Sequence, residues 1–458
     1  MQNNQPFPKF HRSLVASLTL ITLLSLGSCK KYFLDAQPTQ SISDQAVIVD
    51  SSTSLSALLG VYDGLQSSNY YGGDGYAAAA FLSAGDGLWV GTLNYYNTFI
   101  THTYRADNTL LNNVWDDIYK TVNRANQVID KVSGLDPKVI SSSARNQYVG
   151  EAYFIRALTF FDLARAWGNI TLVLKPTSSP SDVKGIKQSN QQQVYTQVLS
   201  DLVKADSLLT NTLNRNRVTK KTVAAFAARV HLYRSEWELA EAFATSIIQD
   251  PSYQLIDWTT FINNKATAES IFELQFTTSD PSAHYGSWSS TSYRNQYCPS
   301  PTLYNLEQDP ATGGDRKLLI KNISTPAITN YFVQQLYWRT NGDNPTYIFR
   351  LAEQYLIRAE ARAKKTTPDL TGALADLNAV RVRAKLAPAT FTQQADIIQA
   401  IEDERRVEFA LEPHRWFDLV RTGRVGDVLG VTDQTKWIFP IPFNDIQANP
   451  DLVQNPLY

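Results

Sequence analysis

Apolar residues recur at helical spacing through much of the chain. The first such segment places them three or four residues apart, at Leu55, Leu58, Leu59, Tyr62 and Leu65. Further segments with the same period span residues 115–132, 145–167 and about 190–210. This spacing puts apolar side chains on one face of a helix, so it predicts a series of amphipathic helices. Gly168 follows the 145–167 segment and is expected to end that helix.

Two later segments repeat one specific pattern. In each, small or apolar residues follow one another at offsets of 12, 4 and 3. The first set is Ala228, Ala240, Ala244 and Ile247, and the second is Ala361, Ala373, Leu377 and Val380. Small residues at this spacing allow the close helix crossing of a tetratricopeptide helix pair. The tryptophan and glycine positions of that repeat are not filled, so two ordinary antiparallel helix pairs are the alternative.

Two regions lack the helical period. Residues 252–348 are rich in Ser, Thr, Asn, Pro and Tyr and contain short alternating runs such as IFELQF, which predict loops and small strands on a helical scaffold. Long loops inside a compact protein usually serve function. Residues 436–458 contain four prolines and no helical period, so we expect an extended tail over the surface.

The N-terminus has the pattern of an export signal. Lys9 and Arg12 precede an uncharged apolar run over residues 13–26, which is too short to be a good membrane span. Small residues then lead directly into Cys29, as in a bacterial lipoprotein processing site. We therefore expect residues 1–28 to be cleaved and acyl chains to anchor Cys29 in a membrane. The alternative is an ordinary signal peptide whose cleavage site adjoins a cysteine.

Composition narrows the function without deciding it. Loss of Lys9 and Arg12 with the leader changes the formal net charge from −1 to −3, which gives no argument for a nucleic-acid partner. Aromatic residues make up 11% of the chain, and they suit sugar recognition and large helical cores equally. If Cys29 carries lipid, Cys298 has no partner in the chain and is predicted to be a buried small hydrophobic residue.

No residue set indicates a catalytic centre, a metal site or a cofactor. The five histidines are scattered, and the Gly72–Gly75 stretch lacks the Lys-Ser/Thr of a phosphate loop. Glu404, Glu408 and Glu412 lie four residues apart on one helix face, close to several arginines. A glycosidase needs two carboxylates about 5–10 Å apart across a cleft. The spacing here favours pairing with arginine instead.

A carbohydrate site has different requirements, which two loop segments and one dipeptide meet. Sugars stack their C–H faces on aromatic rings and hydrogen-bond to polar side chains. Residues 86–105 and 285–297 and the pair Trp338-Arg339 combine both kinds of side chain. The candidate ligand-binding residues are Asp86, Trp89, Asn94, Tyr95, Tyr96, Asn97, Arg105, Trp288, Tyr293 and Trp338. For any one aromatic residue, packing over the helices beneath is an equal alternative.

Several motifs in order resemble one family. They are the Cys29 anchor followed by KKYFLD, then WDDIYKTVNRA (115–125), RALTFFDLARAWG (156–168), RLAEQYLIRAEAR (350–362), LNAVRVRAKL (377–386), IEDERRVEFALEPHRWFDLVRTG (401–423) and the tail PIPFNDIQANPDLVQNPLY (440–458). Together they span essentially the whole mature chain. The sequence resembles the SusD/RagB family, the surface glycan-binding lipoproteins of Bacteroidetes.

The resemblance implies a mostly α fold. Tetratricopeptide-type helical hairpins would form a right-handed superhelical scaffold, with long loops and a few short β-strands. The expected parts are a leader (1–28), a lipid-anchored tether (29–50), a helical region with binding loops (51–251), a loop-rich variable region (252–348) and a C-terminal helical region with the tail (349–458). The family's charged motifs imply ion networks inside this scaffold, formed by Arg350, Glu353, Arg358, Glu360, Glu404, Arg405, Glu408 and Arg415.

The resemblance also implies a function. Family members bind glycan without cleaving it and close like a lid over a TonB-dependent, SusC-like transporter in the outer membrane. The chain is therefore expected to be lipid-anchored at the outer membrane and to face the exterior. Lys30 and Lys31 depart from the acidic residues that follow the anchor in many surface-exported relatives. The alternatives are the same fold binding peptides, a surface glycosidase, and a subunit that gates a transporter without touching ligand.

Overall fold

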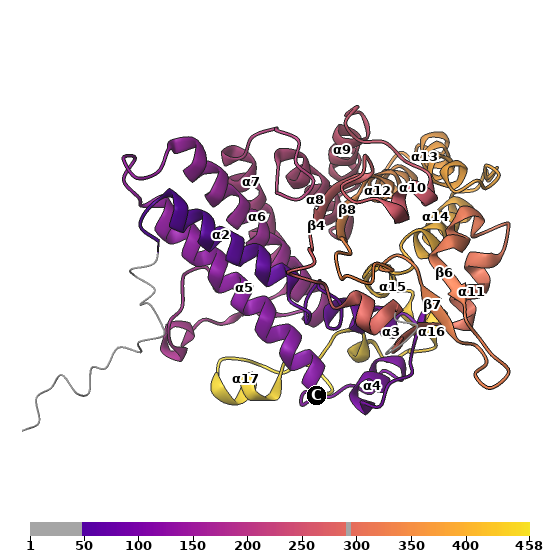
Figure 1. The fold of residues 1–458 in the computed structure, drawn as a ribbon, viewed down its shortest axis with the longest axis horizontal. Helices are drawn as coiled ribbons and strands as arrows, with labels where there is room; N and C mark the ends of the chain where they lie inside the picture. The colour runs from indigo at the N-terminus through magenta and orange to yellow at the C-terminus, as the bar shows by residue number, and fades with distance from the viewer. Residues whose placement is uncertain (1–47, 290–294) are drawn as a thin grey trace, which may run out of the picture. The chain divides into compact units, whose positions relative to one another are not determined.

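The structure is a computed structural model and describes residues 48–289 and 295–458. The predicted leader, Cys29, Lys30, Lys31 and Tyr293 lie outside the described residues. From Asp50 to Tyr458 the chain forms one compact unit. Helices dominate this unit (Figure 1), so the predicted mostly α fold is confirmed.

The first half of the unit is built on long helices that match the predicted segments. They are α2 (Ser51–Gln66), α5 (Thr109–Ser133), α6 (Ser142–Trp167) and α7 (Gln191–Leu208). Each begins after a residue whose side chain accepts hydrogen bonds from the backbone of the first turn, for example Asn108 before α5 and Ser141 before α6. Gly168 follows α6 at a φ of 76°, which glycine adopts readily, and it ends that helix as predicted.

Both predicted helix pairs are present. α8 (Lys220–Tyr233) packs against α9 (Trp237–Ile248), and α12 (Leu351–Lys364) packs against α13 (Leu370–Arg383). Ala228, Ala240 and Ala244 of the first set share an apolar cluster with Ile357 and Ala361 of α12. Ala373, Leu377 and Val380 of the second set lie in another cluster, which also contains Ile397 and Ile401 of α14 (Gln394–Glu408). Helix α12 therefore joins the two pairs, because it packs against α9 on one side and α13 on the other.

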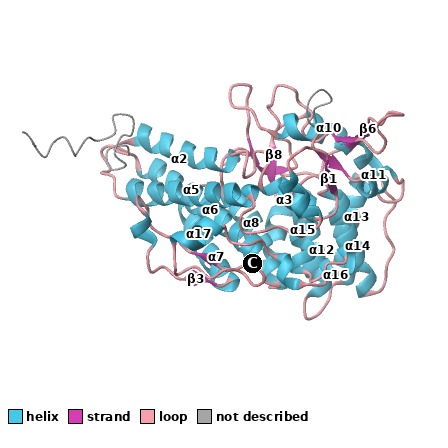
Figure 2. Cartoon of the chain, turned by 90° about the horizontal axis from the view of Figure 1, so that it is seen from below, coloured by secondary structure: helices cyan, strands magenta, loops and turns pink. Residues whose placement is uncertain are grey.

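Strands occur as small antiparallel pairs and not as one large sheet (Figure 2). The pairs are β1 (Gly87–Trp89) with β5 (Tyr297–Pro299), β2 (Ile170–Thr171) with β3 (Gln188–Ser189), β4 (Ser270–Leu274) with β8 (Thr346–Arg350), and β6 (Ile320–Asn322) with β7 (Phe332–Gln334). The IFELQF run lies largely in β4, as predicted. The same region also contains α10 (Trp258–Asn263) and α11 (Pro301–Gln308), which the sequence analysis does not predict.

The C-terminal tail differs from the prediction. Phe439 and Ile441 are fully buried, and the indole N–H of Trp167 donates to the carbonyl of Pro440 at 2.9 Å. The short helix α17 (Phe443–Ala448) follows Pro442. The prediction of an extended surface tail was therefore wrong in this part. The prolines exclude a long helix, but the alternating apolar residues between them pack into the core.

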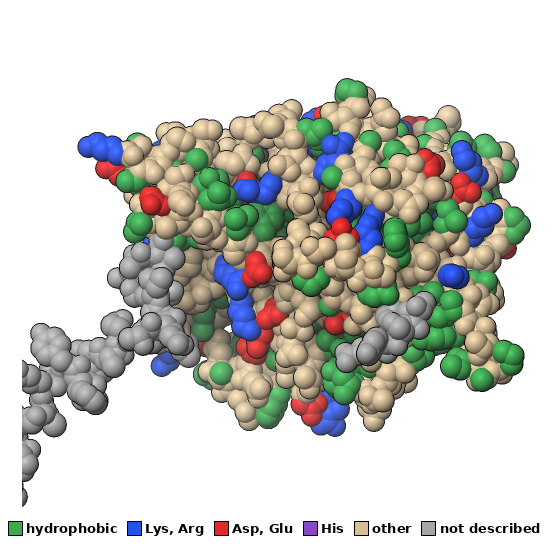
Figure 3. All heavy atoms as spheres, viewed as in Figure 1, with side chains coloured by type: hydrophobic (Ala, Val, Ile, Leu, Met, Phe, Trp, Pro, Cys, Tyr) green, Lys and Arg blue, Asp and Glu red, His purple; other side chains and the backbone are tan. Residues whose placement is uncertain are grey.

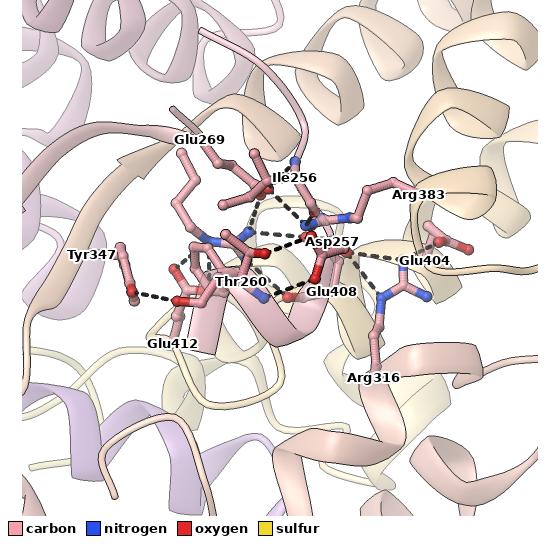
Figure 4. Close-up of polar contacts among 12 residues, drawn as sticks. Ile256, Asp257, Thr260, Glu269, Arg316, Tyr347, Arg383, Glu404, Glu408 and Glu412 are labelled. Atoms are coloured by element: carbon pink, nitrogen blue, oxygen red, sulfur yellow. Dashed lines mark hydrogen bonds and ion pairs between the residues drawn. The ribbon is translucent and has the colours of Figure 1, made fainter. Parts of the chain in front are cut away.

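The charged motifs of the C-terminal half form a buried network (Figure 4). Arg350 contacts Glu412 at 2.6 Å, Glu269 at 2.7 Å and Glu408 at 2.9 Å. Arg316 pairs with both Glu404 and Glu408. The predicted arginine pairing of Glu404, Glu408 and Glu412 is confirmed.

The other charged residues of the motifs are also paired. The remaining pairs are Arg229–Glu353, Arg358–Asp376, Arg421–Glu360, Arg405–Asp418 and Arg415–Glu402. The motifs are thus scaffold, as expected. Cys298 is also buried, as predicted, and its thiol approaches the carbonyl of Phe332 at 3.2 Å.

Candidate functional site

The pairing of β1 with β5 brings together the two loop segments that carry most of the candidate residues. In this pair Trp89 lies opposite Tyr297, Leu88 opposite Cys298 and Gly87 opposite Pro299. The two segments are about 200 residues apart in the sequence. Their meeting builds one aromatic site, which we define as Trp89, Tyr95, Tyr96, Trp288 and Tyr297.

The rings of the aromatic site are in mutual contact. Trp89 stacks on Tyr96 with ring centroids 4.0 Å apart, and Tyr95 lies against Tyr96 at 4.5 Å. Tyr297 lies 5.1 Å from Trp89 and 4.9 Å from Trp288. Contacts of this kind hold aromatic rings in fixed orientations. Tyr297 ends the 285–297 segment but is not among the predicted site residues, because its strand signal, the short run YCP, is too weak to stand out.

The members of the site differ sharply in exposure. Trp89 and Tyr96 are each only 7% exposed, whereas Tyr95 is half-buried and Asn94 and Asn97 are exposed. Within the described part of the chain, neither asparagine side chain makes a hydrogen bond. The site therefore presents one tyrosine and two free amides over a rigid aromatic base.

A close backbone approach fixes the orientation of Trp89. A Cβ placed on Gly91 would lie 2.2 Å from an atom of the Trp89 indole. Only glycine leaves room for the ring at this position. The indole Nε1 is buried and has no hydrogen-bond partner among the described residues.

Asp86 and Trp288 lie inside the protein. Asp86 is 1% exposed and pairs with Arg406 at 2.5 Å; burial raises the pKa of its carboxyl, while the arginine lowers it. Trp288 is also 1% exposed and donates its indole N–H to the carbonyl of Gly73 at 3.0 Å. Next to Trp288 lies His284, whose ring stacks on Tyr337 and whose pKa is lowered to about 3 by burial. These side chains position the loops and have no surface to offer a ligand.

The remaining candidates have local partners of their own. Trp338 is 39% exposed, and its indole N–H donates to the carbonyl of Ile262 at 3.3 Å. The guanidinium of Arg339 lies 5.3 Å from the centre of the Trp338 ring. Arg105 is exposed and pairs with Asp107 at 3.2 Å. Trp338 thus offers an exposed ring, while Arg105 has no contact with the aromatic site.

The surface gives little sign of other chemistry. On the face seen in Figure 3, basic and acidic side chains are interspersed. In the described ranges, no three histidine, cysteine or acidic side chains converge in a way that could hold a metal ion. No helix within those ranges is both long and apolar enough to cross a bilayer.

Known proteins are similar to this chain in sequence and in fold. SusD-like protein P38 of Formosa agariphila is 27% identical, in a match that covers 98% of this chain and 100% of that protein. The starch-binding protein SusD of Bacteroides thetaiotaomicron is 33% identical over 32% of each chain. A solved laminarin-binding SusD-like protein has a TM-score of 0.77 at 24% identity and covers 90% of this chain and 100% of that one, which shows a common fold. Because the model of the SusD family also matches residues 83–430, this chain belongs to the SusD/RagB family.

Proposed function

We propose that this protein captures a glycan on the aromatic site and delivers it to a TonB-dependent transporter without cleaving it. The observation that carries the proposal is the β1–β5 pair, which joins two aromatic loop segments under exposed, unpartnered amides. Relatives named for starch and laminarin binding support a glycan as the ligand class. Of the candidate residues, the proposal assigns ligand contact at the aromatic site to Asn94, Tyr95 and Asn97, and leaves the exposed ring of Trp338 as a separate candidate contact.

The chemistry of these side chains suits a sugar. The half-buried ring of Tyr95 offers a face for sugar C–H groups, and an asparagine amide both donates and accepts hydrogen bonds, as a pair of hydroxyls requires. Trp89 and Tyr96 lie beneath Tyr95 and restrict its motion. Such preorganisation lowers the conformational entropy lost on binding.

The place of action belongs to the same proposal. An export signal that ends at Cys29 supports lipid anchoring at the outer membrane. Exterior display and a SusC-like partner rest on membership of the SusD/RagB family. A Cys29→Ala variant should leave the membrane fraction, and its retention there would contradict the anchor.

Glycan binding is tested by calorimetry against a panel of soluble polysaccharides and peptides, with chromatography of the mixtures for released products. The expected result is binding of at least one glycan with no product. Tyr95→Ala should weaken it about tenfold, which corresponds to about 1.4 kcal/mol. Tyr148→Ala is the control, since Tyr148 is a half-buried tyrosine on α6 outside the aromatic site.

Three outcomes would contradict the proposal. Release of oligosaccharides would indicate a glycosidase, and binding of peptides alone would indicate another ligand class. Equal affinity of the Tyr95→Ala variant and the unmodified protein would place the site elsewhere.

A further inference from the structure

A second cavity lies between α5 and α17, apart from the aromatic site. Its volume is about 440 Å³, and it shares no lining residue with that site. Trp115, Asp116 and Tyr119 line it from α5, Thr171 from β2 and Asp445 from α17. Cavities of this size hold small molecules. The cavity exists because the C-terminal tail folds back beside α5 (Figure 1).

The aromatic wall of the cavity is rigid. The rings of Trp115 and Tyr119 lie 4.9 Å apart, and Trp115 packs edge-on against Trp167 in the core. The hydroxyl of Tyr119 donates to the carbonyl of Thr171 at 2.9 Å. These contacts leave the aromatic faces as an apolar surface whose own polar groups are already satisfied.

The free polar groups of the cavity mostly accept hydrogen bonds. Within the described residues, no basic side chain forms an ion pair with Asp116 or Asp445. Thr171 is 5% exposed, and its hydroxyl is buried without a hydrogen-bond partner. The basic residue of the lining, Lys120, contacts Asp117 at 3.1 Å. The amide of Asn123 already bonds with the backbone of Thr177 in both directions.

The negative charge of Asp116 disfavours ionisation of Asp445. Burial raises the pKa of Asp445, and the Asp116 carboxylate raises it further, whereas a hydrogen bond from Trp115 lowers it. Burial also raises the pKa of Asp116, which Lys120 lowers and Asp117 raises. A cation placed between the two carboxylates would relieve this repulsion.

We propose that this cavity is a second ligand site, which binds a small molecule bearing a protonated primary amine. An ammonium group has three donors and no acceptor, which complements Asp116, Asp445 and the Thr171 hydroxyl. The half-buried ring of Tyr119, which is held in place by the buried Trp115, would contact the apolar side of the molecule and attract its charge. The amine can belong to an amino sugar or to an alkylamine.

Calorimetry with glucosamine, N-acetylglucosamine, glucose and n-butylamine tests the site. Glucosamine or n-butylamine should bind, and the tighter of the two identifies the source of the amine. N-acetylglucosamine and glucose should bind at least tenfold more weakly, because neither carries the ammonium group. Equal binding of glucosamine and N-acetylglucosamine, or no amine binding at millimolar concentration, would overturn the proposal.

Two cavity variants and two controls connect binding to the cavity. Asp445→Asn should weaken amine binding about tenfold, and Asp130→Asn, an exposed aspartate on the same α5 helix, should not. Thr171→Val removes only the unpartnered hydroxyl, so it should weaken binding without loss of thermal stability. Unchanged affinity in both cavity variants would overturn the proposal. Tyr95→Ala should leave amine binding intact, so this test stands or fails separately from glycan capture.

Discussion

The buried arginine network and the aromatic site use their polar groups in opposite ways. Around Arg350 and Glu408, each charge lies against an opposite charge in the interior. At the aromatic site, Asn94 and Asn97 are exposed and make no hydrogen bond within the described residues. The first arrangement leaves nothing for a ligand to bind, whereas the second does. Exposed polar side chains beside ordered aromatic rings are therefore better candidates for ligand contact than the buried, fully paired charges are.

Removing Arg350 from the buried arginine network should cause the largest loss of unfolding free energy. Arg350→Met should lower the free energy of unfolding by about 3–5 kcal/mol, because it leaves buried carboxylates without their counter-ion. Urea unfolding followed by circular dichroism measures this loss. Glu238→Gln, on the exposed surface of α9, is the control and should change little. A loss below about 1 kcal/mol in Arg350→Met would show that the network does not hold the scaffold together.

Acid should act on a second group of buried ion pairs, in which Glu360 contacts Arg421 and Lys364. Arg421 and Lys364 hold the pKa of Glu360 at about 2, against an ordinary value of 4.5, despite its burial. Stability from a lowered carboxyl pKa is present above pH 4.5 and is lost as the pH falls towards 2. Glu360→Gln should therefore be less stable than the unmodified protein by about 3 kcal/mol at pH 7.

The difference in unfolding free energy between Glu360→Gln and the unmodified protein should shrink as the pH falls. Unfolding at pH 7, 4 and 3 measures it, and the gap should narrow steadily over that series. A gap that stays constant with pH would contradict the ionised pair between Glu360 and Arg421.

A smaller effect is expected from disturbing the aromatic base. Gly91→Ala places a methyl group against the Trp89 indole, so the ring must shift, which disturbs its stack on Tyr96. Glycan affinity should fall severalfold, while thermal stability should change by less than it does in Arg350→Met. Gly60→Ala is the control, since a Cβ there meets nothing within 4 Å. Unaltered affinity in Gly91→Ala would mean that the stack beneath Tyr95 does not shape the binding surface.

The smallest effect should come from a buried acid that has no partner. Both carboxyl oxygens of Glu307 lack hydrogen-bond partners among the described residues, and burial raises its pKa well above the ordinary range. Because burial disfavours the ionised carboxylate and the substitution breaks no hydrogen bond among the described residues, Glu307→Gln should change the unfolding free energy by less than about 1 kcal/mol. Glu408 is paired with arginines, so Glu408→Gln should lower the unfolding free energy several times more than Glu307→Gln does. Equal losses in the two variants would contradict this difference between the paired and the unpaired acid.

The scaffold could be predicted because its signals are local. Helical spacing predicted α2, α5, α6 and α7, and Gly168 predicted the end of α6. The tail was predicted less well, because the burial of Phe439 and Ile441 depends on contacts with the end of α6, about 270 residues earlier in the chain. The short helices α10 and α11 were missed for a related reason, since six or eight residues contain too few turns for a period to emerge.

By itself, the sequence determined the helical scaffold, the arginine pairing of Glu404, Glu408 and Glu412, and the two loop segments from which a site is built. Only the tertiary structure decided which of their aromatic side chains face solvent. Tyr95 and Tyr96 are neighbours of the same type, yet Tyr96 is buried under Trp89 and Tyr297 while Tyr95 is partly exposed. The difference comes from β5, about 200 residues away in the chain. The exposure of a side chain depends on which distant segment covers it, and a local sequence pattern contains no information about that segment.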